Sequence, residues 1–276
     1  VTFSGGDDWH YRRMVLHYAA LCAAAGGVET FLIGSELVGL TTVRGAGRSY
    51  PFVNGLVTLA HDVKSLLGSA TRVSYAADWT EWNGHQAGAG DFAFHLDALW
   101  TSADVDFIGI DAYFPLSDWR DVDGPDRTIS AGPYDLGYLA ANVAGGEGFD
   151  WYYPSDTDRL AGRRTPISDD YGKPWLWRCK DLVGWWSNRH YDRVGGVEHA
   201  TASAWLPGLK PIRFTEIGCP GIGFDADARG PKSGQRGQAF IDPGQCNGCG
   251  LCTQVCPFDC ISVVDAASAV SQKKEA

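Results

Sequence analysis

Four short, strongly apolar segments recur along the chain, and longer stretches with helical periodicity separate them. Buried strands are predicted at residues 29–36, 72–79, 105–116 and 211–218. Helices are expected at residues 8–25, 51–67, 92–100, 134–144 and 180–191. Strands that alternate with helices form parallel sheets, because each helix carries the chain back to start the next strand in the same direction. The pattern therefore predicts an α/β fold built from βα units and excludes a β-sandwich.

The overall charge and the longest apolar runs exclude two classes of partner. The 276 residues carry a formal net charge of −10, so the chain has no excess of cations to neutralise nucleic acid or an anionic membrane surface. No run of about 18 apolar residues is present, and no membrane span is expected. The first residues lack the apolar core of a signal peptide. They also lack an initiator Met, so we expect the chain to come from a longer protein.

Two of the predicted strands end in a glutamate, Glu36 and Glu216. In a β/α barrel the carboxyl ends of the strands carry the chemistry, because the loops that follow them form the mouth of the site. Two carboxylates across such a mouth suit glycoside hydrolysis, in which one protonates the leaving oxygen and the other attacks or activates water. The alternative is that these glutamates are ordinary surface residues of an acidic chain.

Aromatic and polar side chains near these strand ends are candidate sugar contacts, since the faces of pyranose rings stack on aromatic rings. The predicted substrate-binding residues are Ser35, Asp78, Trp79, Asp111, Tyr113 and Trp177. Further tryptophans that could stack on a sugar are Trp82, Trp119, Trp151, Trp185 and Trp186. The alternative for all the aromatic residues is a place in the core. His95 and His190 are interpreted as packing or surface residues rather than as acid–base groups.

Several segments together resemble a known family. They are FLIGSE, RVSYAADWTEW, VDFIGIDAYFPLSDWRD, NVAGGEGFDWYY and KPIRFTEIGCP. Residues 1 to about 220 resemble the TIM-barrel-like domain of the large tail (host-specificity) protein of gene transfer agents and siphophages, which is similar to a clan of retaining glycosidases. The resemblance implies that Glu36 is the acid/base and Glu216 the nucleophile. It also implies a tail or particle component, assembled in the bacterial cytoplasm, that contacts other tail or baseplate proteins and a cell-envelope polysaccharide or peptidoglycan.

The sequence departs from this family pattern in two ways. Ser35 stands where the glycosidase clan usually has Asn before its acid/base, which puts the usual substrate contacts in doubt. A whole barrel has eight strands in about 250 residues, whereas four strands are predicted here. We therefore expect a partial (β/α)8 TIM-like barrel at residues 1–220, truncated at both ends, then a linker at 221–239 and a separate segment at 240–276.

The last segment contains a run of cysteines with the spacing CxxCxxCxxxCP. Cys246, Cys249, Cys252 and Cys256 match the bacterial ferredoxin run, which predicts a small ferredoxin-like segment with a 4Fe-4S cluster. It resembles the first half of a two-cluster ferredoxin, in which the fourth cysteine serves the other cluster. Cys260 is therefore an alternative fourth ligand. A zinc site, or a remnant that binds no metal, are the other interpretations.

Three functions follow from these patterns. The first is a tail module that binds or hydrolyses envelope glycan as a retaining glycoside hydrolase. The second is a structural tail module whose barrel catalyses nothing. The third is a cytoplasmic electron carrier that works through its iron–sulfur cluster.

Overall fold

The computed structural model describes residues 10–120 and 124–218. All of them belong to the first of the two units into which the chain divides, Val1–Ile222. The predicted linker and cysteine run lie outside the described residues. The domain boundaries expected near residues 220 and 240 therefore stay predictions.

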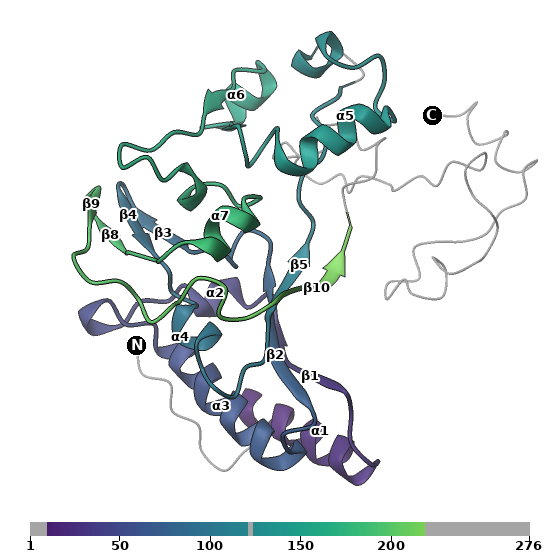
Figure 1. Ribbon diagram of the computed structural model, residues 1–276, viewed down its shortest axis with the longest axis vertical. Helices are drawn as coiled ribbons and strands as arrows, with labels where there is room; N and C mark the ends of the chain where they lie inside the picture. Colours follow the sequence, from purple (N-terminus) through teal and green to yellow (C-terminus); the bar gives the residue numbers. More distant parts are fainter. Residues whose placement is uncertain (1–9, 121–123, 219–276) are drawn as a thin grey trace, which may run out of the picture. The chain divides into compact units, whose positions relative to one another are not determined.

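A four-stranded parallel sheet forms the centre of the fold (Figure 1). Its strands are β1 (Thr30–Ser35), β2 (Arg72–Asp78), β5 (Ile108–Ala112) and β10 (Ile212–Ile217). They lie in the order β1-β2-β5-β10, and each adjacent pair is parallel. The four predicted strands and the α/β fold class are confirmed.

The sheet curves as the wall of a barrel does. The Ser35 hydroxyl on β1 donates a 2.9 Å hydrogen bond to the Asp111 carboxylate on β5, although β2 lies between these strands. Strands two positions apart are roughly 10 Å apart in a flat sheet, so the bond requires strong curvature. In TIM barrels, inward-pointing side chains from alternate strands meet in this way. The described residues thus form part of a TIM-like barrel, as expected.

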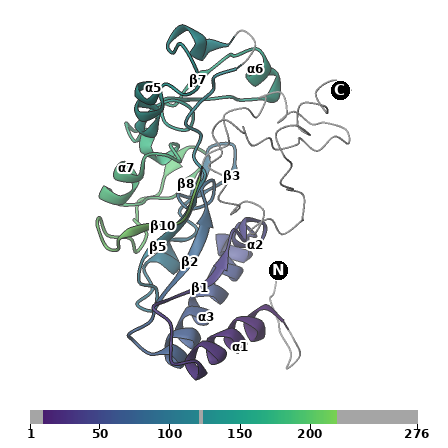
Figure 2. The ribbon, with the colours of Figure 1, turned by 90° about the vertical axis from the view of Figure 1, so that its right-hand side faces the viewer.

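Two helices, α1 (Tyr11–Ala24) and α3 (Pro51–Leu67), lie side by side and pack against β1 and β2 (Figure 2). Pro51 opens α3 and Gly68, with φ of 80°, ends it, as the sequence predicts. The buried face of α3 repeats at helical spacing, with Val53, Leu56, Leu59, Ala60 and Val63. This apolar stripe buries the outer face of the sheet.

A second, antiparallel sheet was not expected from the sequence. Its strands are β3 (His85–Gly88), β4 (Asp91–Ala93), β8 (Arg193–Val194) and β9 (Val197–Glu198). The helix predicted at 92–100 is wrong in its first half, because residues 91–93 pair with β3 and β8 and leave only α4 (Asp97–Trp100). Two short helices follow β1, α2 (Val38–Thr41) and η1 (Ala46–Arg48).

Aromatic side chains form the core between this second sheet and α7 (Leu182–Ser187). The Trp185 ring lies 5.0 Å from that of Trp82 and 4.8 Å from that of Trp205, and all three are buried. Trp82 and Trp185 are therefore core residues, so neither stacks on a sugar. His190 is fully buried, with Asp97 and the Trp185 carbonyl bonded to its ring, which confirms it as a packing residue.

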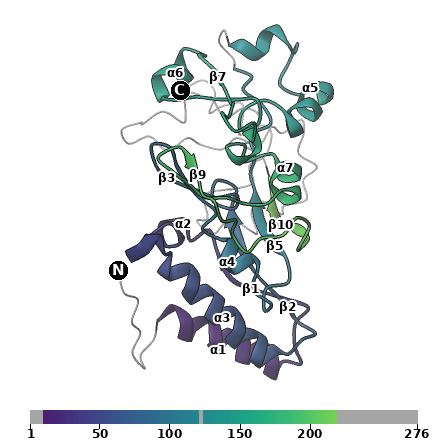
Figure 3. The ribbon, with the colours of Figure 1, turned by 60° about the vertical axis from the view of Figure 1, so that its left-hand side comes forward.

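The long segment between β5 and α7 lies beyond the carboxyl end of β5 (Figure 3). It holds η2 (Pro125–Thr128), α5 (Leu136–Ala141), η3 (Asn142–Ala144), β6 (Trp151–Tyr152), α6 (Asp156–Leu160), β7 (Thr165–Pro166) and η4 (Pro174–Leu176). The helix predicted at 134–144 is confirmed as α5 followed by η3, and the one at 180–191 is the shorter α7. No helix in residues 10–120 and 124–218 is long and apolar enough to cross a bilayer.

Burial of His95 predicts a loss of stability in mild acid. His95 is 4% exposed, and burial lowers its pKa to about 3. Between the unfolded pKa near 6.5 and pH 5, the unfolded chain binds a proton here that the folded chain does not, so folding weakens as the pH falls. From pH 7.5 to 5, this residue costs about 2 kcal/mol of unfolding free energy.

Urea denaturation at the two pH values measures this loss. His95→Phe is expected to lose about 2 kcal/mol less than the wild type over the same interval. Thr58→Ala, which changes an exposed residue of α3 that does not titrate, is the control and should follow the wild type. An equal loss in His95→Phe and wild type would contradict the assignment.

Candidate active site

Each of the four parallel strands brings an acidic side chain to its carboxyl end. Glu36 directly follows β1, while Asp78, Asp111 and Glu216 lie within β2, β5 and β10. Asp78 and Glu216 are both in register with Asp111, so these three residues lie side by side across the sheet. The structure thus brings together the two predicted catalytic glutamates and the two predicted aspartates at the carboxyl ends of the parallel strands.

Asp111 is fully buried at the centre of this group. Besides the Ser35 hydroxyl, the Thr215 hydroxyl on β10 donates to its carboxylate at 2.6 Å. Donors from both sides supply the hydrogen bonds that a buried carboxylate needs. Ser35 and Thr215 consequently connect both edge strands to the centre of the sheet. Thr215 was not predicted, although its place directly before Glu216 in the last strand is a usable signal.

Local backbone irregularities set the direction of the two glutamates. The register of β1 against β2 shifts between Leu32 and Ser35, and that of β10 shifts just before Glu216. Such bulges redirect side chains near active sites. Within the first bulge, a Cβ on Gly34 would come 2.4 Å from the Tyr11 hydroxyl, so a larger residue there would displace Tyr11 from its hydrogen bond to the Ile33 carbonyl.

Glu36 itself has a left-handed backbone conformation, with φ of 52°. For a residue other than glycine, this conformation costs on the order of 1–3 kcal/mol and persists only where the surroundings fix it. The Glu36 amide donates a 2.9 Å hydrogen bond to the Ala76 carbonyl of β2. Strain of this kind gathers at functional sites, which makes Glu36 the most distinctive residue of the cluster.

The two glutamates have different electrostatic surroundings. Loss of hydration, and then the negative charges of Asp78, Asp111 and Glu216, raise the pKa of Glu36 above its ordinary value. A raised pKa favours the protonated form that a general acid requires. Glu216 accepts a 2.7 Å hydrogen bond from the Tyr113 hydroxyl, and this bond raises the pKa of Tyr113.

The predicted aromatic contacts divide between two places. Trp79, directly after β2, packs edge-on against Phe114, whose ring lies 6.4 Å from that of Phe214. This row of rings joins the segments that directly follow β2 and β5 to strand β10. Trp177 instead packs against Phe92 and donates its indole N–H to Asp169 at 3.0 Å. These contacts place Trp177 beside the second sheet rather than in contact with the carboxylates.

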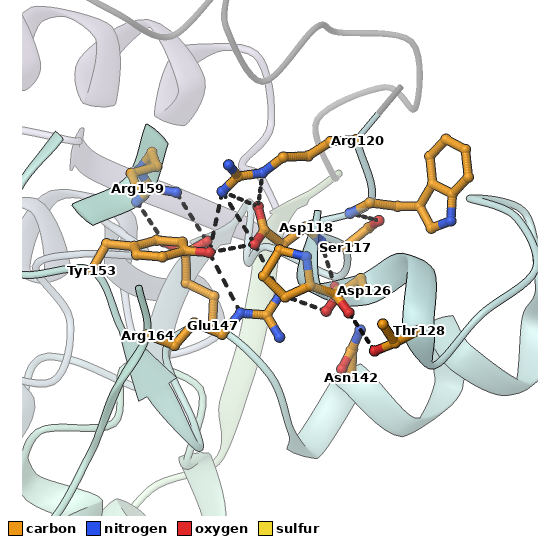
Figure 4. A network of polar contacts seen from close by, with 12 residues as sticks. Ser117, Asp118, Arg120, Asp126, Thr128, Asn142, Glu147, Tyr153, Arg159 and Arg164 are labelled. Atoms are coloured by element: carbon orange, nitrogen blue, oxygen red, sulfur yellow. Dashed lines mark hydrogen bonds and ion pairs between the residues drawn. The ribbon is translucent and has the colours of Figure 1, made fainter. Parts of the chain in front are cut away.

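A network of buried ion pairs holds together the segment beyond β5 (Figure 4). Arg164 bridges the carboxylates of Asp118 and Asp126, and Arg120 pairs with Asp118 at 3.1 Å. The Tyr153 hydroxyl donates to Asp118 at 2.6 Å. Both aspartates are buried, and the bonds of Arg164 span 46 and 38 residues of sequence. The network therefore ties one end of the segment to the other.

Beside this network lies a small polar cavity of about 110 Å³. Its polar lining includes Ser117, Asp118, Asp126, Asn142, Glu147, Asp150 and Arg164. The Glu147 carboxylate pairs with Arg159 at 2.5 Å, and the Arg164 guanidinium lies 3.8 Å from the centre of the Trp151 ring. No sequence pattern predicts this network, because its partners are far apart in the chain and follow no common spacing.

The structure describes two of the cysteines, Cys22 and Cys179, and neither forms a disulfide. The predicted cluster ligands, Cys246 to Cys256, lie outside the described residues. Within residues 10–120 and 124–218, no group of three or more His, Cys, Asp or Glu side chains is arranged to hold a metal ion.

Comparison with known families gives two matches. The sequence profile of the GTA TIM-barrel-like domain matches residues 9–244, which is most of the chain. The profile of the 4Fe-4S binding domain matches residues 239–262 and covers the cysteine run. No curated protein matches the chain.

The ion-pair network predicts a large effect of removing Asp126. Asp126→Ala leaves Arg164 with one carboxylate partner and removes the buried carboxylate that accepts from the Tyr138 hydroxyl. Breaking a buried network in this way costs about 3–5 kcal/mol of unfolding free energy, measured by urea denaturation. Arg12→Ala, which breaks the exposed pair with Asp62, is the control and costs about 0–1 kcal/mol. Equal effects of the two substitutions would show that the network contributes no more than a surface pair.

Proposed function

Because the chain belongs to the family of GTA TIM-barrel-like domains, we propose that it is a tail module of a gene transfer agent or phage that hydrolyses a glycan of the host cell envelope. The observation that carries this proposal is the cluster of carboxylates at the strand ends, in which Glu36 and Glu216 are both exposed. Loss of hydration and the nearby carboxylates raise the pKa of Glu36, which suits a proton donor. Glu216 instead accepts a hydrogen bond from Tyr113, which suits a nucleophile held in one orientation.

The proposed reaction is a retaining double displacement. The protonated Glu36 carboxyl donates its proton to the glycosidic oxygen while a Glu216 oxygen bonds to the anomeric carbon and the leaving alcohol departs. Glu36, now ionised, then takes a proton from water, whose oxygen displaces Glu216 from the anomeric carbon. The hydrogen bond from Tyr113 orients the Glu216 carboxylate for its attack.

The neighbouring side chains suit a polyhydroxylated substrate. In this proposal Asp78 accepts hydrogen bonds from sugar hydroxyls, and Trp79 offers an aromatic edge beside them. Ser35 and Asp111 bond one another and shape the floor of the site. The proposed substrates are cell-envelope polysaccharide or peptidoglycan, and the proposed protein partners are other tail or baseplate components.

Substitution of the two glutamates tests the proposal. With purified peptidoglycan and capsular polysaccharide as substrates, we expect Glu36→Gln to lower kcat about 10²–10⁴-fold, because it removes the proton donor. Glu216→Gln is expected to abolish release of reducing ends, because it removes the nucleophile.

The matched control is Glu29→Gln, which changes the glutamate at the opposite end of the same strand, where the side chain is exposed and paired with Arg72. Its activity should equal that of the wild type. If the folded wild type cleaves neither substrate, the catalytic proposal is wrong, and the barrel is a structural tail module.

We further propose that the C-terminal segment binds a 4Fe-4S cluster. The match of residues 239–262 to the 4Fe-4S binding domain and the CxxCxxCxxxCP spacing support this second function. The proposed ligands are Cys246, Cys249, Cys252 and Cys256, with Cys260 as the alternative fourth ligand. Electron transfer in the cytoplasm is the function that such a cluster would serve.

Anaerobic reconstitution of the full chain with iron and sulfide tests this second proposal. We expect bound iron and the broad visible absorbance of a thiolate-ligated cluster, both lost in Cys249→Ser. Cys22→Ser, in helix α1, is the control and should retain both signals. Protein that stays colourless and free of iron after reconstitution excludes the cluster.

A further inference from the structure

A carboxylate outside the proposed catalytic pair is buried at the carboxyl end of β2. Glu81, three residues after the end of β2, is 1% exposed. Its carboxylate accepts hydrogen bonds from the Thr41 hydroxyl, the Tyr75 hydroxyl at 3.1 Å and the Asp78 amide at 3.2 Å. Within the described part of the chain no Lys, Arg or His pairs with it, so neutral donors alone compensate its burial. Burying a carboxylate without a cationic partner costs free energy, so this position requires a structural reason.

Tyr75 connects this carboxylate to the backbone that follows Glu36. The Tyr75 side chain is fully buried, and its hydroxyl accepts a 2.6 Å hydrogen bond from the Leu37 amide. The same hydroxyl donates to Glu81. A chain of hydrogen bonds therefore runs from the Leu37 amide to Glu81, with the Tyr75 hydroxyl as acceptor for the first and donor to the second.

These bonds account for the left-handed conformation of Glu36. The amide of Glu36 is bonded to the Ala76 carbonyl, and the next amide, that of Leu37, is bonded to Tyr75. Both acceptors belong to β2, so two consecutive peptide groups around the strained residue are fixed to the neighbouring strand. The hydroxyl of Thr41, the last residue of α2, also donates to Glu81, so the segment after Glu36 is bonded to this carboxylate at a second point.

We propose that Glu81 and Tyr75 are positioning residues that hold Glu36 in its left-handed conformation and so keep its carboxylate beside those of Asp78, Asp111 and Glu216. That Glu36 serves as an acid/base rests on the proposed function, whereas its placement by Glu81 and Tyr75 does not. The Asp78 amide bonds the same carboxylate, so a single buried group fixes the ends of both β1 and β2.

Titration of Glu36 in the full chain tests this placement without any substrate. The Glu36 side-chain carboxyl is followed by ¹³C NMR and assigned by its disappearance in Glu36→Gln. In the wild type we expect a pKa above the ordinary value of glutamate. Tyr75→Phe removes one hydroxyl and keeps the buried ring. It is expected to lower the Glu36 pKa by about 0.5 pH unit or more, because the released loop gives Glu36 more water and moves it away from the other carboxylates.

The matched control is Tyr138→Phe in the segment beyond β5. The Tyr138 hydroxyl also accepts from a backbone amide, that of Asp118, and donates to a buried carboxylate, Asp126, so the chemical change is the same at a different place. It should leave the Glu36 titration unchanged. Thr41→Val, which removes another donor to Glu81, serves as a second variant if Tyr75→Phe does not fold, and should shift the pKa in the same direction.

A folded Tyr75→Phe or Thr41→Val protein in which Glu36 titrates as in the wild type overturns the inference. This outcome is distinct from a failure of the proposed function, which shows as an absence of glycan cleavage. The shift of the Glu36 pKa can be present in a protein that cleaves nothing, and cleavage can depend on Glu36 without any shift in these variants.

Discussion

The carboxylate of Asp111 links both edges of the central sheet to its middle. It is fully buried, so it needs hydrogen-bond donors, and the donors come from Ser35 on β1 and Thr215 on β10. The bond to Ser35 crosses over β2 and forms only if the sheet curves. One buried polar group therefore couples the curvature of the sheet to the positions of the two residues, Glu36 and Glu216, that directly follow its donors in the chain.

The proposed site combines a rigid centre with exposed edges. The central strands β2 and β5 are buried along almost their whole length, whereas β1 and β10 expose apolar side chains such as Leu32, Phe214 and Ile217. The catalytic candidates lie on these edge strands, where a substrate can reach them. Buried groups on the central strands and the loop after β2, namely Asp111, Tyr75 and Glu81, hold the edge strands in place. Hydrogen bonds to buried groups thus fix the positions of the exposed glutamates.

A second polar network gives the segment beyond β5 an interior of its own. The interior of this segment is formed by the ion pairs of Arg164 with Asp118 and Asp126, where a core elsewhere consists of apolar side chains. The Tyr153 hydroxyl donates a further hydrogen bond to Asp118. Two of the sequence segments that resemble the tail-protein family, residues 105–121 and 142–153, contribute to this network and its cavity.

The sequence by itself determined the features that depend on neighbouring residues. The apolar runs identified all four parallel strands, Pro51 and Gly68 identified the ends of α3, and the position of Glu36 and Glu216 after apolar runs placed them at one edge of the sheet. Parallel strands connected by helices must align their carboxyl ends, so this much follows from local patterns. The spacing of the cysteines likewise predicts a cluster without any knowledge of the fold.

Only the tertiary structure decided which side chains meet. Trp79 and Trp82 are three residues apart, yet Trp79 is half-buried against Phe114 and Trp82 is buried in the core. The strands of the second sheet, two to four residues long, are too short to show an alternating pattern. Hydrogen bonds such as that between Ser35 and Asp111 join residues 76 positions apart. No local pattern encodes such contacts, because they depend on how the whole sheet curves and how its loops return to it.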